Sequence, residues 1–180
     1  FAAFTVIPYI TIYLQSNAGM QAAQVPWIYL CGGVATLLSA RHFGRLTDRV
    51  GKVRMFQRLA LAVTVPLMAT TLSQGLPLWG LLAISTLFFT VMSGRMIPGM
   101  AMISSAVEPR LRGTFMTLNS AVQSASMGMA ALVAGLIIGR DGQGQLTFYW
   151  VAGLLGVVAS LLSAWLAGHL RLHGAPVKAA

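Results

Sequence analysis

Acidic residues are nearly absent from this sequence, and charge of either sign is scarce. Its 180 residues include three Asp and Glu against twelve Lys and Arg, and charged residues together make up 8%. A soluble domain usually carries about 25% charged residues, so this chain has too few charges to cover a surface that faces water. The single cysteine, Cys31, excludes a disulfide framework, and the histidines form no ligand pairs with acidic neighbours. The sequence therefore predicts no metal site and no cofactor.

Apolar residues are what the sequence has in abundance. Hydrophobic types make up 57% of it, and its mean hydropathy is +0.76. Such a composition suits a chain that is solvated by a lipid bilayer. The net charge of +9 would by itself suggest a nucleic-acid partner. The bases, however, lie in short gaps between apolar runs and not on a face interleaved with aromatic residues, so we expect no nucleic-acid binding.

Long apolar runs indicate membrane-spanning helices, because about 20 apolar residues cross the hydrocarbon core as a helix. Reading from one helix breaker to the next predicts six spans. Their approximate bounds are Phe1–Leu14, Val25–Phe43, Met55–Leu72, Leu78–Ser105, Thr114–Ile138 and Thr147–Leu170. The first run is short, already apolar at its start and unlike a signal peptide, so we expect a truncated helix and a chain that is a fragment. The fold class predicted is an all-α polytopic membrane bundle over residues 1–172, followed by a short cytoplasmic tail over residues 173–180.

Basic residues mark one side of this predicted bundle. They cluster from Arg41 to Arg58, around the gap between the second and third spans, and they recur after the fourth and sixth spans. The alternate gaps contain no Lys or Arg, or only Arg140 beside Asp141. Short loops rich in Lys and Arg stay in the cytoplasm. We therefore predict a multi-pass protein of the bacterial inner membrane with both chain ends in the cytoplasm.

The segment of residues 44–54, GRLTDRVGKVR, carries the most specific pattern in the chain. Gly44 permits close approach of helix ends, and Gly51 permits a tight turn with positive φ. Asp48 can accept hydrogen bonds at a helix N-terminus and pair with a neighbouring arginine. At every defining position the segment resembles the signature loop of the major facilitator superfamily, G-x-L-x-D-[RK]-x-G-[RK]-x-[RK].

This resemblance implies a conformational latch that breaks during alternating access. Its residues in this chain would be Gly44, Asp48, Arg49, Gly51, Lys52 and Arg54. The alternative is a generic basic loop that only fixes topology, and such a loop would not need one acid framed by two glycines.

Two further elements resemble the same family. Ser93–Gly99 is similar to its R-x-x-x-G element, and Glu108–Gly113 to the P-x-x-R-G turn that opens the next helix. The fifth span lacks the G-x-x-x-G-P-x-x-G-G element typical of the first half of the family, so the resemblance implies the C-terminal half of a twelve-helix transporter. The partners implied are the missing N-terminal six-helix half, a small-molecule substrate and protons. Within the family, the run FTVIPYITIYLQSNAGM (residues 4–20) and the fourth span most resemble drug–proton antiporters and arabinose-efflux permeases.

Arg95 is the only ionisable residue well inside a predicted span. An arginine at the bilayer centre costs roughly 3 kcal/mol on insertion scales, so such residues usually face a cavity or a partner. Two interpretations stay open: a gating or substrate-anion contact, or a packing arginine bonded to carbonyls freed near Pro98 or to a carboxylate from elsewhere. No Asp or Glu lies inside a span, so we expect the proton carrier in the missing half.

Other side chains in the spans are candidates for a substrate cavity because they are polar or, like methionine, suit loosely specified apolar ligands. They are Asn119 and Gln123 one turn apart on the fifth span, Thr5, Tyr9 and Tyr13 on one face of the first, and Met96 in a methionine stripe. For the methionines, packing against lipid or core is the commoner role. Pro8 allows a bend in the first span. Small residues at three- and four-residue steps from Ser120 to Gly139 predict close helix packing.

The function predicted is transport of a small molecule by alternating access, as efflux of a drug-like compound or a sugar, coupled to proton antiport. A complete six-span protein that forms a homo-oligomeric channel or a membrane scaffold is the alternative. An enzyme is not expected, because the spans lack paired carboxylates, an H-E-x-x-H motif and a Ser/His pair.

Overall fold

The computed structural model describes residues 1–169, so the predicted tail at 173–180 lies outside the described residues. The elements follow one another in the order α1 (Ile7–Ser16), η1 (Ala22–Gln24), α2 (Val25–Val50), α3 (Lys52–Ala62), α4 (Thr64–Thr71), α5 (Leu78–Ser105), η2 (Pro109–Leu111), α6 (Arg112–Ile137), β1 (Gly139–Arg140), β2 (Leu146–Thr147) and α7 (Tyr149–Gly168). Over residues 1–169 the regular structure is therefore helical apart from one short hairpin.

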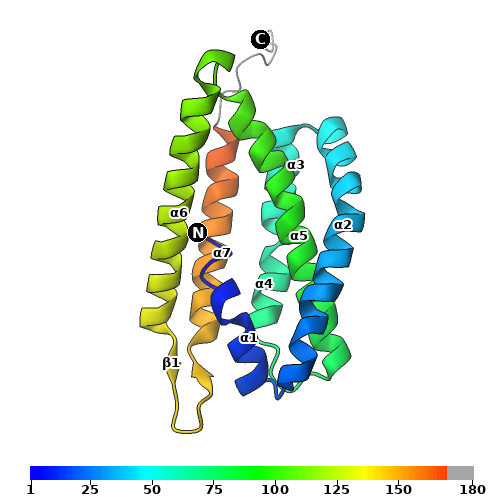
Figure 1. Ribbon diagram of the computed structural model, residues 1–180, viewed down its shortest axis with the longest axis vertical. Coiled ribbons are helices and arrows are strands. Elements are labelled where there is room, and N and C mark those ends of the chain that lie inside the picture. Colours follow the sequence, from blue (N-terminus) through cyan, green and yellow to red (C-terminus); the bar gives the residue numbers. More distant parts are fainter. Residues whose placement is uncertain (170–180) are drawn as a thin grey trace.

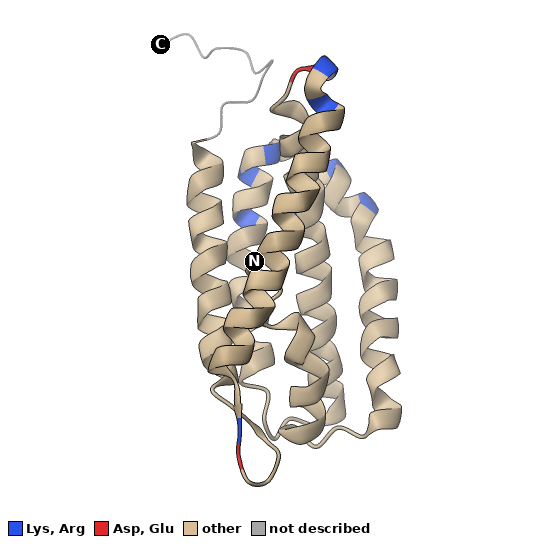
Figure 2. Ribbon diagram, turned by 60° about the vertical axis from the view of Figure 1, so that its left-hand side comes forward, with Lys and Arg blue, Asp and Glu red and all other residues tan. Residues whose placement is uncertain are grey.

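The long helices lie along a common axis and form an elongated bundle (Figure 1). α5 packs on α2 and α3, while α7 packs on α3 and α4. α6 makes its main helix contact with α7 and lies at the edge of the bundle in Figures 1 and 2. One long helix is thus far less enclosed by the described chain than the others.

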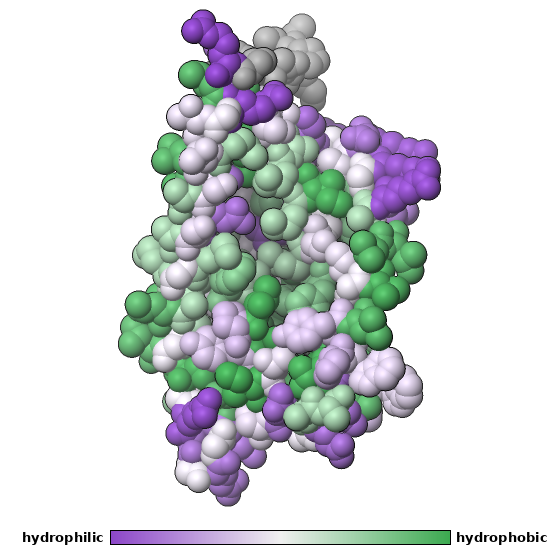
Figure 3. Space-filling model, in the orientation of Figure 1, coloured by the Kyte–Doolittle hydropathy of each residue, from purple (hydrophilic) through white to green (hydrophobic). Residues whose placement is uncertain are grey.

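The outer surface of the bundle is apolar along its length. Four helical stretches are long and apolar enough to cross a membrane: Ala22–Val50, α5, α6 and α7. Large hydrophobic side chains point outward from them, such as Leu37 at 78% exposure and Leu136 at 80%. Figure 3 shows the hydrophilic residues gathered mainly at the two ends of the molecule. A lipid bilayer is the solvent that suits such a surface.

Glycines let α5 approach α2 closely. A Cβ on Gly94 would lie 2.6 Å from the ring of Phe43, and a Cβ on Gly32 would lie 2.9 Å from Cδ2 of Phe89. Real Cβ atoms do not tolerate such distances, so a larger residue at Gly94 or Gly32 would force the Phe43 or Phe89 side chain, or the helices themselves, to shift. The α2–α5 pair thereby holds the cavity-bearing helix in place.

The predicted spans agree best with the structure in α5, whose bounds are those of the fourth span. The third span is not one helix, because α3 and α4 are separated at Val63. Pro66 has no N–H to donate to the Ala62 carbonyl, which removes a helical hydrogen bond beside this break. Pro8 lies in the first turn of α1, where proline suits a helix start, and residues 2–6 before it form turns instead of a continuous helix.

The predicted signature loop, residues 44–54, is mostly helical, which corrects the sequence-based expectation. α2 continues to Val50, and α3 begins directly after Gly51. No strong breaker follows Phe43 before that point, and the Thr47 hydroxyl donates back to the Phe43 carbonyl at 2.7 Å. Gly51 has a φ of +94°, as its predicted turn requires. Gly44 faces open space, so the close approach predicted there is wrong for the described chain.

The β1–β2 hairpin joins α6 to α7, and the side chain of Asp141 stabilises its turn. The strands pair antiparallel, with Arg140 opposite Leu146. In the turn, Oδ1 of Asp141 accepts hydrogen bonds from the backbone amides of Gln143 at 3.0 Å and Gln145 at 2.8 Å. Asp141 thus serves the turn and is not part of a buried site.

Asn17 ties this hairpin to the end of α1. Its Nδ2 donates to the Leu146 carbonyl at 2.9 Å, and its Oδ1 accepts from the Leu146 amide at 2.8 Å. The side-chain amide pairs with the backbone of β2 as a neighbouring strand would. α1 is therefore attached at this end to the connection between α6 and α7.

Candidate functional site

A cavity of about 300 Å³ lies between α5 and α6, beside residues 1–4. We call it the Arg95 cavity. Its wall comprises Phe1, Ala2, Ala3, Phe4, Phe56, Met92, Arg95, Met96, Gly99, Met100, Ile103, Asn119, Val122, Gln123 and Met127. Among the sequence-predicted candidates, Arg95, Met96, Asn119 and Gln123 come together here. Figure 3 shows hydrophilic colour recessed within the apolar surface of the bundle.

Two serines of α7 fix the guanidinium of Arg95. Nη1 donates to Oγ of Ser160 at 2.9 Å, and Nη2 donates to Oγ of Ser163 at 2.6 Å. The Ser160 hydroxyl donates its hydrogen bond to the Ala60 carbonyl at 2.8 Å, and the Ser163 hydroxyl donates to the Ser160 carbonyl at 2.7 Å. Since a hydroxyl has one proton and two lone pairs, both serines can only accept from Arg95. The network links α5, α7 and α3.

An aromatic ring completes this arrangement. The guanidinium carbon of Arg95 lies 4.8 Å from the centroid of Phe56 on α3, within the range of a cation–π interaction. The packing interpretation is therefore correct in part: Arg95 does bond to neighbouring helices, through serine hydroxyls and an aromatic face. It also lines the cavity, so the two interpretations do not exclude each other.

No carboxylate neutralises Arg95 within residues 1–169. The acids of the sequence are Asp48, Glu108 and Asp141, and all three are exposed near helix ends or in the hairpin. The charge of Arg95, in the middle third of the longest helix, therefore has no acidic partner among the described residues.

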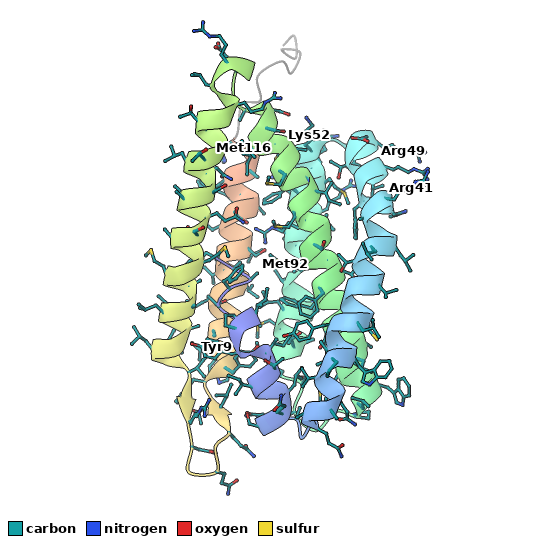
Figure 4. All side chains as sticks on the ribbon, viewed as in Figure 1. Tyr9, Arg41, Arg49, Lys52, Met92 and Met116 are labelled. Carbon is teal, nitrogen blue, oxygen red and sulfur yellow. The ribbon has the colours of Figure 1, made fainter. Side chains whose placement is uncertain are left out.

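Methionines form the apolar wall of the cavity along α5. Met92, Met96 and Met100 recur at four-residue steps and all line it. Met92 points toward the middle of the bundle in Figure 4. On the opposite wall, Asn119 is half-buried and Gln123 is exposed, so their amide groups can reach a molecule in the cavity from α6.

The first-span candidates lie elsewhere. Thr5 is fully buried and donates to the Ala2 carbonyl at 3.0 Å, and Tyr9 donates to the Ala131 carbonyl of α6 at 3.3 Å. Tyr13 stacks on Tyr149 of α7 with ring centroids 4.5 Å apart. Tyr9 and Tyr13 therefore hold α1 against α6 and α7, whereas the hydrogen bond of Thr5 is local. None of the three lines the Arg95 cavity, and Tyr13 borders a separate cavity at the hairpin end.

The residues of the predicted latch lie at the end of the bundle where most bases gather (Figure 2). Asp48, Arg49 and Arg54 are exposed, and Arg41 and Arg49 point away from the helices in Figure 4. Lys52 is the exception: its Nζ donates to Oγ of Ser105 at 2.6 Å. It therefore connects the start of α3 to the end of α5.

Sequence reasoning missed the residues that position Arg95. Ser160 and Ser163 lie three residues apart in an otherwise apolar helix, a spacing that puts both on one face. That pair of hydroxyls was a signal in the sequence, although their partner could not be named from it. Phe56 gave no signal, because an aromatic residue near a span end is common.

Comparison with known proteins shows a family similarity that covers nearly the whole chain and not only residues 44–54. The family model described as Major Facilitator Superfamily matches residues 1–178. No curated protein and no solved structure matches the chain.

Proposed function

Because the chain belongs to the Major Facilitator Superfamily and is an integral membrane transporter of small molecules by that membership, we propose that it forms one six-helix half of the transporter and that substrate binds in the Arg95 cavity. The observation that carries this proposal is the position of Arg95. Its charge is costly in a membrane, yet it is held at a cavity wall by side chains of two other helices.

The polar face of α6 supports a second half. Thr117, Ser120, Gln123 and Ser124 are exposed in the described chain, although hydrocarbon is a poor solvent for such groups. Lower on the same helix, Ala131 is covered by Tyr9 of α1. A homologous six-helix half over the uncovered part would enclose these groups and the open side of the cavity. This is the partner that the resemblance implies.

Proton-coupled efflux is the transport mode that we favour. The described spans contain no Asp or Glu, and a membrane carboxylate is the usual proton carrier in transporters, so we assign the titrating group to the second half. We propose the outward direction because residues 4–20 and α5 resemble drug–proton antiporters and arabinose-efflux permeases.

The charge distribution supports a location in the bacterial inner membrane. Lys and Arg gather at one end of the bundle, while Arg140 and Asp141 lie at the other (Figure 2). By the positive-inside rule, the end with most bases lies in the cytoplasm. We therefore assign the Asn17-bound hairpin to the opposite side of the membrane.

The test is transport by the full-length protein in liposomes with an imposed pH gradient. A panel of labelled drugs and sugars should include compounds whose movement saturates with concentration and reverses when the gradient is reversed; protein-free liposomes are the control. Saturable movement that ignores the gradient would remove proton coupling. Movement without saturation would favour the channel, and no movement of any compound would contradict the proposal.

A further inference from the structure

We propose that the Arg95 cavity selects amphipathic organic anions: the guanidinium binds the acidic head group, and the methionine wall holds the apolar body. This inference rests on the proposed function and names the chemical class of its substrate. It depends on three features of the cavity, which are an uncompensated charge, open guanidinium nitrogen and an apolar wall on one side.

The charge comes first, because it decides the sign of the ligand. Ser160 and Ser163 orient the guanidinium but are neutral, and the ring of Phe56 adds no full negative charge. No ion pair forms in the part of the chain that the structure describes, and the cavity wall next to the arginine on α5 carries Met92, Met96 and Met100 and no acid. In a medium of low dielectric, a fixed cation attracts an anion far more strongly than it does in water.

The guanidinium also keeps hydrogen-bond donors for a ligand. It has five N–H groups, and the serines occupy one on each Nη. Within residues 1–169 no side-chain nitrogen is both buried and without a partner, and Nε of Arg95 donates to none of the described residues. Nε is therefore not fully buried. Phe56 covers one face of the group, so a ligand meets the remaining edge, which suits the two oxygens of a carboxylate.

The rest of the cavity fits the apolar part of such a ligand. Methionine side chains are flexible and polarisable, and they accommodate ligands of varied shape. A volume of about 300 Å³ lies at the lower end of the usual range for small-molecule sites, roughly 300–1,000 Å³. Asn119 and Gln123 face this space from α6 and can donate to a second head-group oxygen. A compact molecule with one acidic end meets all these contacts.

Three probes of equal chain length separate charge from apolar contact. Octanoate, octanamide and octylammonium can be compared for binding to the purified full-length protein by calorimetry. We expect octanoate to bind about 10- to 100-fold more tightly than octanamide, the factor for a hydrogen bond to a charged group, and octylammonium to bind most weakly. Arg95→Gln should remove the preference for octanoate, while Arg95→Lys should keep part of it.

Arg58→Gln is the matched control. It removes the same charge from an exposed position on α3 that is outside the cavity, and it should retain the octanoate preference. Ser163→Ala, which removes one support of the guanidinium, should give an intermediate loss. Insertion of each variant is checked by its yield and elution volume, and Arg95→Lys replaces Arg95→Gln if the latter does not fold.

Several outcomes would overturn the proposal. They are equal affinity for octanoate and octanamide, tighter binding of octylammonium, or an octanoate preference that survives Arg95→Gln. If any of these occurs while other compounds are still transported, the substrate class is wrong and the proposed function stands. If no compound of any class is transported in liposomes, the proposed function itself fails.

Discussion

The segment Gly44–Arg54 has a specific sequence pattern but few contacts with other helices, whereas Arg95 has no surrounding motif but many such contacts. The first is the most specific motif in the chain, yet within the described residues only Lys52 reaches another helix through a side-chain hydrogen bond. The second rests on one isolated arginine, yet it joins three helices around a cavity. A specific motif can thus serve a contact with a partner, or a contact that forms only in another conformation. A single buried charge, by contrast, needs hydrogen-bond partners in every conformation.

The largest effect should come from removing the isolated charge. Arg95→Ala in the full-length protein should lower the transport rate on the order of 100-fold, because two charge-assisted hydrogen bonds and the ligand contact are lost together. Met96→Leu, the neighbouring cavity residue, should change it no more than a few-fold, since volume and polarity are nearly kept. Initial rates in liposomes measure both. Equal rates for the two variants would show that Arg95 has a purely structural role.

A substitution in the motif should have a smaller effect, and it should change transport without changing stability. Asp48 is exposed, so Asp48→Asn should leave membrane insertion and the melting temperature unchanged. If Asp48 forms a latch in another conformation, transport should fall roughly tenfold, the size of a typical conformational coupling. Glu108→Gln removes the other exposed acid near that end and should be neutral. Normal transport by Asp48→Asn would contradict the latch role.

The one interhelical contact of the motif should have a smaller effect again. A double-mutant cycle of Lys52→Ala and Ser105→Ala should give a coupling free energy of about 1 kcal/mol in thermal unfolding. Transport should change by no more than a few-fold. Strict additivity of the two variants would show that the 2.6 Å contact adds nothing to stability.

The smallest effect on transport should come from the hairpin end. Asn17→Ala removes both side-chain hydrogen bonds to Leu146, so the amide of Leu146 should exchange with solvent about tenfold faster. Transport should stay within about twofold of the unchanged protein, since this site is far from the Arg95 cavity. Hydrogen-exchange mass spectrometry measures the first quantity. Gln15→Ala, an exposed change on the same helix, should leave the exchange rate unaltered.

Much of the fold could be predicted because hydropathy and breakers act locally. Pro77 and the polar residues after Ser105 delimit α5, and its bounds were predicted correctly. The break at Val63 was missed because its cause, the absent N–H of Pro66, interrupts a helix without ending its apolar run. The helix through Gly44 was missed because one glycine costs too little to stop a helix by itself.

The site was less predictable than the fold. That Arg95 needs partners follows from its charge alone, but which partners it finds depends on how α7 and α3 pack beside α5. Asn119 and Gln123 line the cavity as proposed, whereas the polar groups of Thr5 and Tyr9 are taken up by nearby carbonyls. Sequence shows that a polar side chain in a membrane must be satisfied, and only the fold shows whether another helix or a cavity does so.

The hairpin between α6 and α7 offers a position for a reporter group. Asp141 and Asn17 hold it through backbone amides and a carbonyl, so the side chain of Gln143 takes no part and is exposed. A thiol introduced by Gln143→Cys, in a chain whose Cys31 is replaced by serine, would leave these bonds in place. A membrane-impermeant maleimide should label it in intact spheroplasts, and a fluorophore attached there would report from the membrane face opposite the bases.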